Sequence, residues 1–139
     1  LHLIGSKMPE RLKSRTAPGL EVHGFVSDLE PFMNGCRISL APLRYGAGVK
    51  GKVNQAMSHG LPVVATSCAA EGMYTEHGRD ILVADDAAAF AAEVCRLYRD
   101  GDLWARLAAN GRINVERYFS LDAARRSLES LLAELEPGG

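Results

Sequence analysis

The sequence is poor in cysteine and almost neutral in charge. Its 139 residues include three cysteines, Cys36, Cys68 and Cys95, an odd and widely spaced set without a C-x-x-C pair. This spacing favours neither a disulfide framework nor a zinc site, and it is typical of reduced thiols in a cytosolic protein. Sixteen Lys and Arg against seventeen Asp and Glu give a net charge of -1. Because a nucleic-acid binder carries a clearly basic face, we expect no nucleic-acid partner.

Long hydrophobic runs are also missing. No apolar run approaches the roughly 18 residues that a membrane helix needs, so we expect no transmembrane segment. The chain begins Leu1-His2-Leu3-Ile4, without Met or a charged leader, and we interpret it as a fragment of a longer protein. We expect a cytoplasmic location, with peripheral contact at the inner membrane face left open for the longer protein. Apolar residues make up 47% of the chain, which excludes disorder and suits a packed domain.

The order of expected elements indicates the fold class. Strands are predicted at residues 1–4, 20–26, 38–43, 62–66 and 81–83, and helices at 9–14, 29–34, 52–59, after Asp86, from Asp102 and after Ser120. Strands that alternate with helices predict an α/β fold, a Rossmann-like parallel sheet flanked by helices, with a helical C-terminal end. We interpret Trp104 and the leucines after Ser120 as core. Ligands of such sheets bind at the carboxyl ends of the strands.

A glycine-rich loop joins the third expected strand to a helix. Residues 46–52, GAGVKGK, hold three glycines with Lys50 and Lys52 at the point where the helix begins. Glycine lets a backbone approach a ligand closely, and a helix N-terminus attracts an anion. The loop therefore predicts a phosphate-binding site.

The same loop matches the dinucleotide fingerprint G-x-G-x-x-G, which alone is a weak signal. That motif belongs after the first strand of a dinucleotide domain, and its variable positions do not call for lysines. Its acidic residue should end the next strand, whereas Glu71 lies beyond Thr66 in a loop. An NAD-type oxidoreductase domain remains the alternative from another enzyme class.

The run GAGVKGKVNQAMSHGLPVVATSCAAEGM resembles the donor-binding half of group 1 glycosyltransferases, glycosyltransferase family 4, which have the GT-B fold. The resemblance extends to GFVSDLEPFMNGCRISLAPLRYG before it, and to ILVADDAAAFAAEV and LWARLAANGRINVERYFS after it. It implies a hexosyltransferase-type enzyme of polysaccharide biosynthesis that retains configuration and needs no metal or other cofactor. Residues 1–139 would form the C-terminal nucleotide-sugar domain, without its first strand-helix unit and without the N-terminal acceptor domain.

The resemblance also implies partners. The donor would be a nucleotide-diphosphate sugar, and the acceptor a saccharide or lipid-linked saccharide held by the missing domain. The isolated fragment would bind nucleotide without transferring sugar.

Individual roles follow from the same resemblance. Gly48, Val49 and Lys50 would line the diphosphate, and Lys50 would act in catalysis by stabilising the departing nucleoside diphosphate. Lys52 would add a second charge. Gln55 stands where the family usually has a glutamate that holds the ribose, and Ala47 where a first glutamate contacts the sugar. These two departures keep a third alternative open, a nucleotide-binding module without catalysis.

Five further residues complete the expected donor site. Gly24 and Phe25 resemble the segment that contacts the base, largely through its backbone. Arg44 and Tyr45 would border the phosphates, since an arginine suits phosphate geometry. Glu71 would accept a hydrogen bond from a sugar hydroxyl. The four histidines show no ligand spacing, and we expect His2 and His23 to pack within their strands.

Overall fold

The structure is a computed structural model that describes residues 1–135. The chain forms two compact units, Leu1–Phe32 and Met33–Gly139. The closing Pro137-Gly138-Gly139 lies outside the described residues. The strands of the described chain form two parallel sheets, one of two strands and one of three. The α/β class with parallel sheets flanked by helices is therefore confirmed, although the expected single sheet is replaced by two.

The first unit is a small strand-helix-strand element. β1 (His2–Ile4) and β2 (Glu21–His23) pair in parallel, with α1 (Glu10–Lys13) between them in the chain. β2 is shorter than the predicted strand at 20–26, since only three residues of β1 pair with it. Beyond the ladder, the Gly5 N–H donates to the Gly24 carbonyl at 3.1 Å. No described residue of this unit is buried. α2 (Glu30–Gly35) crosses the boundary into the second unit.

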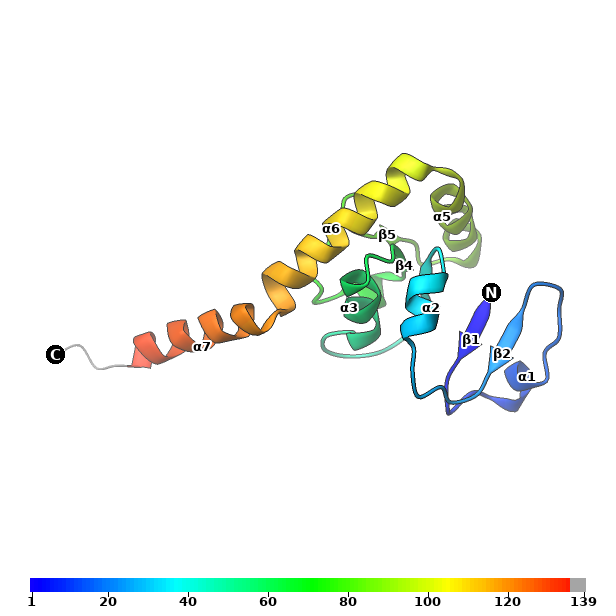
Figure 1. The fold of residues 1–139 in the computed structure, drawn as a ribbon, viewed down its shortest axis with the longest axis horizontal. Coiled ribbons are helices and arrows are strands. Elements are labelled where there is room, and N and C mark those ends of the chain that lie inside the picture. Colours follow the sequence, from blue (N-terminus) through cyan, green and yellow to red (C-terminus); the bar gives the residue numbers. More distant parts are fainter. Residues whose placement is uncertain (136–139) are drawn as a thin grey trace. The chain divides into compact units, whose positions relative to one another are not determined.

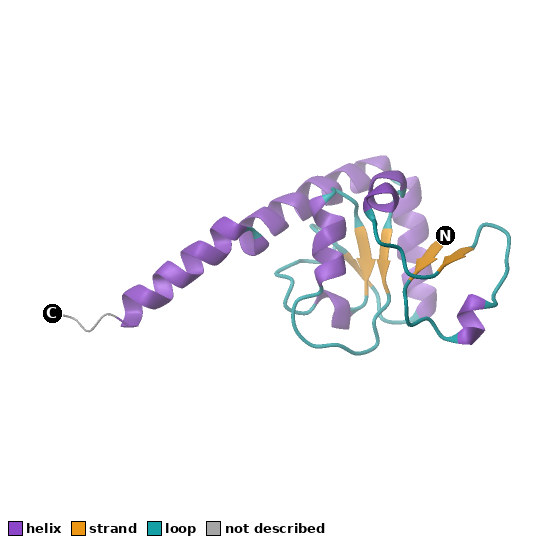
Figure 2. Ribbon diagram, turned by 60° about the horizontal axis from the view of Figure 1, so that its bottom comes forward, coloured by secondary structure: helices purple, strands orange, loops and turns teal. Residues whose placement is uncertain are grey.

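The second unit has three parallel strands in the order β3-β4-β5. Figures 1 and 2 show strands of this unit with helices beside them. The strands are β3 (Ser39–Ala41), β4 (Val63–Ala65) and β5 (Leu82–Val83), and the helices are α3 (Gly51–Ser58), α4 (Ser67–Ala70), α5 (Ala87–Arg99), α6 (Gly101–Phe119) and α7 (Leu121–Leu135). The prediction missed the four-residue α4. Each of the other predicted elements is present, with bounds that differ by a few residues.

The core of the second unit lies on both faces of β4. Val63 and Ala65 pack with α3 on one face, where Met57 is buried. Val64 points to the other face and packs with Leu97 of α5 and residues of α6. All three strand residues are fully buried, as their continuous apolar run predicts.

Helix ends in this unit are set by local chemistry. The Asp86 side chain accepts hydrogen bonds from the Ala88 and Ala89 N–H groups and thereby caps α5. Gly60 follows α3 with a φ of 69°, a conformation that favours glycine. α6 begins at Gly101, one residue before the predicted start at Asp102, because the Asp100 side chain caps that helix by accepting from the Leu103 N–H.

The leucines of α7 are exposed, so their interpretation as core is wrong. Ala123 is the one buried residue of this helix within the described chain. The exposed leucines are Leu121, Leu128, Leu131, Leu132 and Leu135. The three strands are already covered by α3, α5 and α6, which leaves α7 no sheet to cover. Trp104, by contrast, packs against the core on the α5 face as expected. No helix within residues 1–135 is long and apolar enough to cross a bilayer.

Candidate functional site

The carboxyl ends of β3, β4 and β5 meet at one edge of the three-stranded sheet. Parallel pairing puts the loop after β3, the start of α4 after β4 and Asp85 after β5 at that edge. The Ser67 side chain joins two of these segments, because its hydroxyl donates to Asp85 Oδ2 at 2.6 Å. Edges of this kind are where ligands of open parallel sheets bind.

The glycine-rich loop is tied to the segment that follows β4. The Thr66 hydroxyl donates to the Leu43 carbonyl at 2.6 Å and fixes the start of the loop. The Cys68 thiol approaches the Gly46 carbonyl at 3.9 Å. At the loop's end, the Lys50 backbone N–H donates to Met73 Sδ at 3.4 Å. These contacts hold a loop with few side chains in one place.

Lys50 is the most confined charge of this loop. Only 9% of the residue is exposed, although nearly every other residue from Pro42 to Lys52 is open to solvent. Its ammonium donates to the Gly48 carbonyl at 2.6 Å, and no carboxylate among residues 1–135 forms an ion pair with it. A confined cation without a counter-ion is costly, and an anion would compensate it.

Two glycines before Lys50 set the course of the loop backbone. Gly48 has a φ of 71°, which favours glycine. A Cβ on Gly46 would lie 3.5 Å from Lys50 Cε. Such a contact is an ordinary one, so the G-x-G spacing is favoured by the positive φ of both glycines, which is 154° at Gly46.

The N-terminus of α3 adds a second attraction for an anion. Lys50 is its N-cap residue, but the helix has no side-chain cap and no acidic residue in its first turn. The positive end of the helix dipole is thus uncompensated beside the Lys50 ammonium. Lys52 is exposed in the first turn, and Gln55, three positions later and on the same side of the helix, is half-buried. Lys50 and Lys52 are therefore at the N-terminus of α3, and Gln55 follows in the middle of the same helix.

The other predicted residues of the second unit surround this edge less tightly. Tyr45 and Val49 are 88% and 54% exposed. Arg44 is exposed and lines a groove of about 510 Å³ beside the strand ends, together with Thr66, Asp85 and the apolar Leu40 and Phe90. Glu71 is exposed after α4, and within the described chain its carboxylate has no hydrogen-bond partner.

Gly24 and Phe25 belong to the first unit, where they follow β2. Both are exposed, and the Phe25 ring is among the most open apolar side chains of the described chain. The Gly24 carbonyl is engaged by the Gly5 N–H.

Three residues of the site were missed by sequence reasoning. Thr66 and Met73 fasten the two ends of the glycine-rich loop. Both residues are close in sequence to segments that sequence reasoning did single out, the buried strand at 62–66 and the segment at 70–72. The hydrogen bond from Thr66 to Leu43, however, spans 23 positions and leaves no pattern in a single sequence. Asp85 was missed as well. The hydroxyl and the backbone N–H of Ser67 both donate to it and hold the pKa of its carboxyl below the ordinary value.

Parallel strands covered on both faces, with a glycine-rich loop and a helix N-terminus at their carboxyl ends, define a Rossmann-like α/β domain. The family described as Glycosyl transferases group 1 matches residues 1–100. The chain belongs to this family, and its fold is that of the GT-B glycosyltransferases.

A curated relative is an uncharacterized 44.6 kDa protein in the cps region of Klebsiella pneumoniae. It is 37% identical over 67 residues, which cover 48% of this chain and 17% of that protein. Similar solved structures include HepE of Anabaena in complex with UDP and sucrose-phosphate synthase of Thermosynechococcus elongatus. HepE is 19% identical with a TM-score of 0.74, over 84% of this chain and 32% of HepE. The synthase is 20% identical with a TM-score of 0.76, over 96% of this chain and 38% of the synthase.

The chain thus spans about a third of the length of these solved proteins and less of the curated relative. Family membership decides against the oxidoreductase alternative.

Proposed function

We propose that this chain is the donor-binding domain of a glycosyltransferase and that its glycine-rich loop holds the diphosphate of a nucleotide sugar. One observation carries the proposal. The Lys50 ammonium is confined at the N-terminus of α3 with a backbone carbonyl as its partner and no carboxylate among residues 1–135. A diphosphate would supply the missing negative charge, and charge-assisted hydrogen bonds to it are among the strong ones.

Lys50 would serve the reaction as well as binding. Negative charge grows on the nucleoside diphosphate as its bond to the sugar breaks, and a preorganised cation stabilises that charge. The backbone at Gly48 and Val49 would lie along the diphosphate. Exposed Lys52 would add a second positive charge, which salt screens more strongly than the confined charge of Lys50. We further propose that the transfer retains configuration at the sugar, as the resemblance to the family implies. It would need no metal ion, since Lys50 would supply positive charge beside the diphosphate.

The remaining roles concern the rest of the donor. Gln55 would bind the ribose hydroxyls through its amide, which both donates and accepts. Gly24 and Phe25 would face the base, and Arg44 and Tyr45 would border the phosphates. Glu71 would accept from a sugar hydroxyl. The solved complexes of HepE with UDP and with UDP-glucose support a nucleotide sugar as the class of donor.

The acceptor belongs to the longer protein in this proposal. The chain covers about a third of its solved relatives, so an acceptor, a saccharide or a lipid-linked saccharide, would be held outside residues 1–139. We place the reaction in the cytoplasm and expect the isolated chain to bind nucleotide without transferring sugar.

The test is calorimetric titration of the chain with UDP, GDP, ADP and NAD. We expect saturable binding of one nucleoside diphosphate, weakened about tenfold or more by Lys50→Ala, which corresponds to about 1.4 kcal/mol. Lys52→Ala is the matched control within the same turn. It removes an exposed lysine, so its effect should be smaller and should vanish at high salt.

Two results would contradict the proposal. Equal losses for the two lysine variants would remove the special role of the confined ammonium. Preferential binding of NAD, or no saturable binding of any of the four ligands, would count against a donor site in this chain. Nucleotide binding by a whole protein that fails to transfer sugar would instead favour the non-catalytic module that Ala47 and Gln55 leave open.

A further inference from the structure

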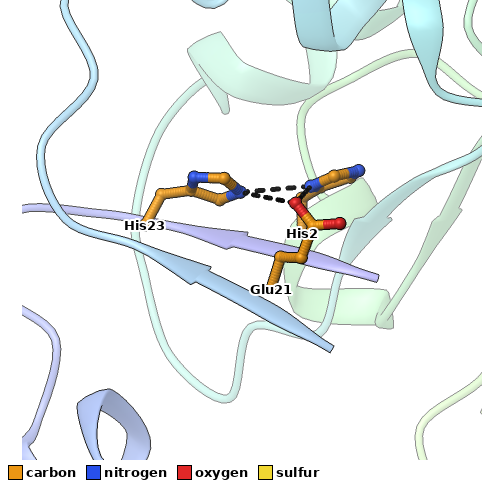
Figure 3. A group of neighbouring side chains, drawn as sticks. All are labelled: His2, Glu21 and His23. Carbon is orange, nitrogen blue, oxygen red and sulfur yellow. Dashed lines mark hydrogen bonds and ion pairs between the residues drawn. The ribbon is translucent and has the colours of Figure 1, made fainter. Parts of the chain in front are cut away.

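We propose that His2, Glu21 and His23 form a binding site for a divalent transition-metal ion, with Zn²⁺ as its probe, and that the bound ion clamps β1 to β2. The three side chains lie on one face of the two-stranded sheet (Figure 3). The inference is independent of the proposed donor site.

The strand register explains how residues so far apart in the chain meet. His2 of β1 pairs directly with Glu21 of β2. Side chains two positions apart on a strand share a face, so His23 lies on the same side as Glu21. The three side chains thereby converge from two backbones that the ladder holds parallel. A sequence separation of 21 residues gives no ligand pattern, which is why no such site was predicted.

The distances suit a tetrahedral ion. His2 Nδ1 lies 3.1 Å from His23 Nε2 and 3.4 Å from Glu21 Oε2, and His23 Nε2 lies 3.7 Å from the same oxygen. Zinc binds imidazole nitrogen and carboxylate oxygen at about 2.0–2.2 Å, which puts two ligand atoms of a tetrahedron about 3.3–3.5 Å apart. The three atoms therefore need shifts of only a few tenths of an ångström.

The imidazoles are held in place before any ion binds. The Phe32 ring packs edge-on against both, with centroid distances of 5.4 Å to His2 and 5.1 Å to His23. The two side chains are 34% and 28% exposed, and Glu21 is 66% exposed. The ligand atoms thus lie against an apolar ring on one side and open to water on the other, where a water molecule would take the fourth position.

The types of ligand limit the choice of metal ion. Two imidazoles and one carboxylate suit Zn²⁺, Ni²⁺ or Cu²⁺ better than Mg²⁺ or Ca²⁺, which take oxygen ligands.

The position of the site indicates its role. The first unit has no buried residue, and an ion bound across its two strands would stabilise their pairing, since binding to the folded state alone stabilises that state.

The experiment is a calorimetric titration of the untagged chain with Zn²⁺, acetylated at its N-terminus. Acetylation matters because the Leu1 amine is next to His2 and could chelate the ion without β2. We expect one ion per chain, with affinity reduced about tenfold or more by His23→Gln. Glu21→Gln should weaken binding by a smaller factor, and because Glu21 is exposed this variant keeps the fold.

His59→Gln is the matched control, since it removes a histidine of the second unit. The affinity of the His59→Gln variant for Zn²⁺ should equal that of the unchanged chain. The imidazole NMR signals of His2 and His23 should shift with the ion, while those of His59 and His77 stay in place.

Hydrogen exchange tests the clamp itself. The Glu21 N–H donates to the Leu1 carbonyl and the Gly5 N–H to the Gly24 carbonyl. Zn²⁺ should slow exchange of these amides by about threefold or more, and EDTA should reverse the effect. The Ala84 amide of the second unit should be unaffected.

The proposal is overturned if Zn²⁺ does not bind saturably, if His23→Gln and Glu21→Gln bind it as tightly as the unchanged chain, or if exchange of the β1–β2 amides stays the same. Binding that survives both substitutions would assign the ion to the free thiols or to the other histidines.

Discussion

Each of the two units is stabilised internally, and the interactions that stabilise them differ. In the second unit, β4 is buried on both faces between α3 and α5, and side chains such as Leu97 and Leu107 are fully removed from water. In the first unit, no described residue is buried. Its two strands are joined by their ladder and by a polar cluster in which a phenylalanine ring supports two imidazoles.

The difference matters because the two kinds of force respond to different conditions. Burial of apolar area follows the shape of the core and depends little on ions. A two-stranded sheet without a core is marginal in water, so it gains from anything that binds its folded form. The second unit therefore provides a rigid edge for a donor loop, whereas the stability of the first unit is open to control by a ligand.

The largest expected effect is in the core of the second unit. Leu107→Ala removes a fully buried side chain beside Leu97 and Val64 and should cost about 2–5 kcal/mol. Urea unfolding followed by the fluorescence of Trp104, which packs against the same cluster, measures this loss. Val22→Ala in β2 removes a half-buried side chain and should cost about 1 kcal/mol or less. Equal costs at the two positions would show that the first unit has a core after all.

An intermediate effect is expected where backbone geometry, and not burial alone, fixes an element. Gly60 ends α3 with a φ of 69°, and a Cβ there would meet Arg112 Nε at 2.5 Å. Arg112 also donates to the His59 carbonyl, a hydrogen bond that the arginine would have to give up to make room. Gly60→Ala should therefore cost about 1–3 kcal/mol in the same urea assay. Gly101→Ala, at a position without positive φ and with open space around it, is the control and should be neutral or slightly stabilising. If both substitutions were neutral, the end of α3 would not be constrained as the structure indicates.

How far sequence predicts structure also differs between the units. In the second unit the run PVVAT predicted a strand buried on both faces, and the GAGVKGK loop was correctly placed between a strand and a helix. Both signals are local, since they depend on residues that are neighbours in the chain. The exposure of the α7 leucines was not predictable, because amphipathic spacing marks an apolar face without telling what covers it.

In the first unit the informative contact is not local. The meeting of His2 with His23 depends on the parallel register of β1 and β2, which an unaligned sequence does not encode in any spacing. The same is true of Thr66 and Leu43 in the second unit, whose hydrogen bond fixes the donor loop. Which residues would meet in a site was therefore predictable only where all of them lie in one segment of the chain. Whether the ten predicted donor-site residues act together remains a prediction for the titrations to test.

The smallest effect is expected from a polar contact in the second unit, where packing and not hydrogen bonding dominates. Hydrogen bonds from the hydroxyl and backbone N–H of Ser67 lower the pKa of Asp85 below its ordinary value of 3.8. A carboxyl with a depressed folded-state pKa stabilises the fold above its ordinary value, and this contribution is lost as the pH falls through the folded-state pKa. Asp85 should therefore weaken the second unit on acidification below about pH 4.

Ser67→Ala removes the hydroxyl bond and leaves the backbone bond. The pKa of Asp85 should consequently rise part of the way toward 3.8, and the variant should lose less stability between about pH 4 and pH 2 than the unchanged chain. The carboxyl carbon shift of Asp85, followed by NMR across that range, measures the change. Ser58→Ala, which removes a hydroxyl that donates to the Gln55 carbonyl, should leave the titration of Asp85 as it was. An unchanged Asp85 pKa in Ser67→Ala would mean that the hydroxyl bond contributes nothing to the depressed pKa.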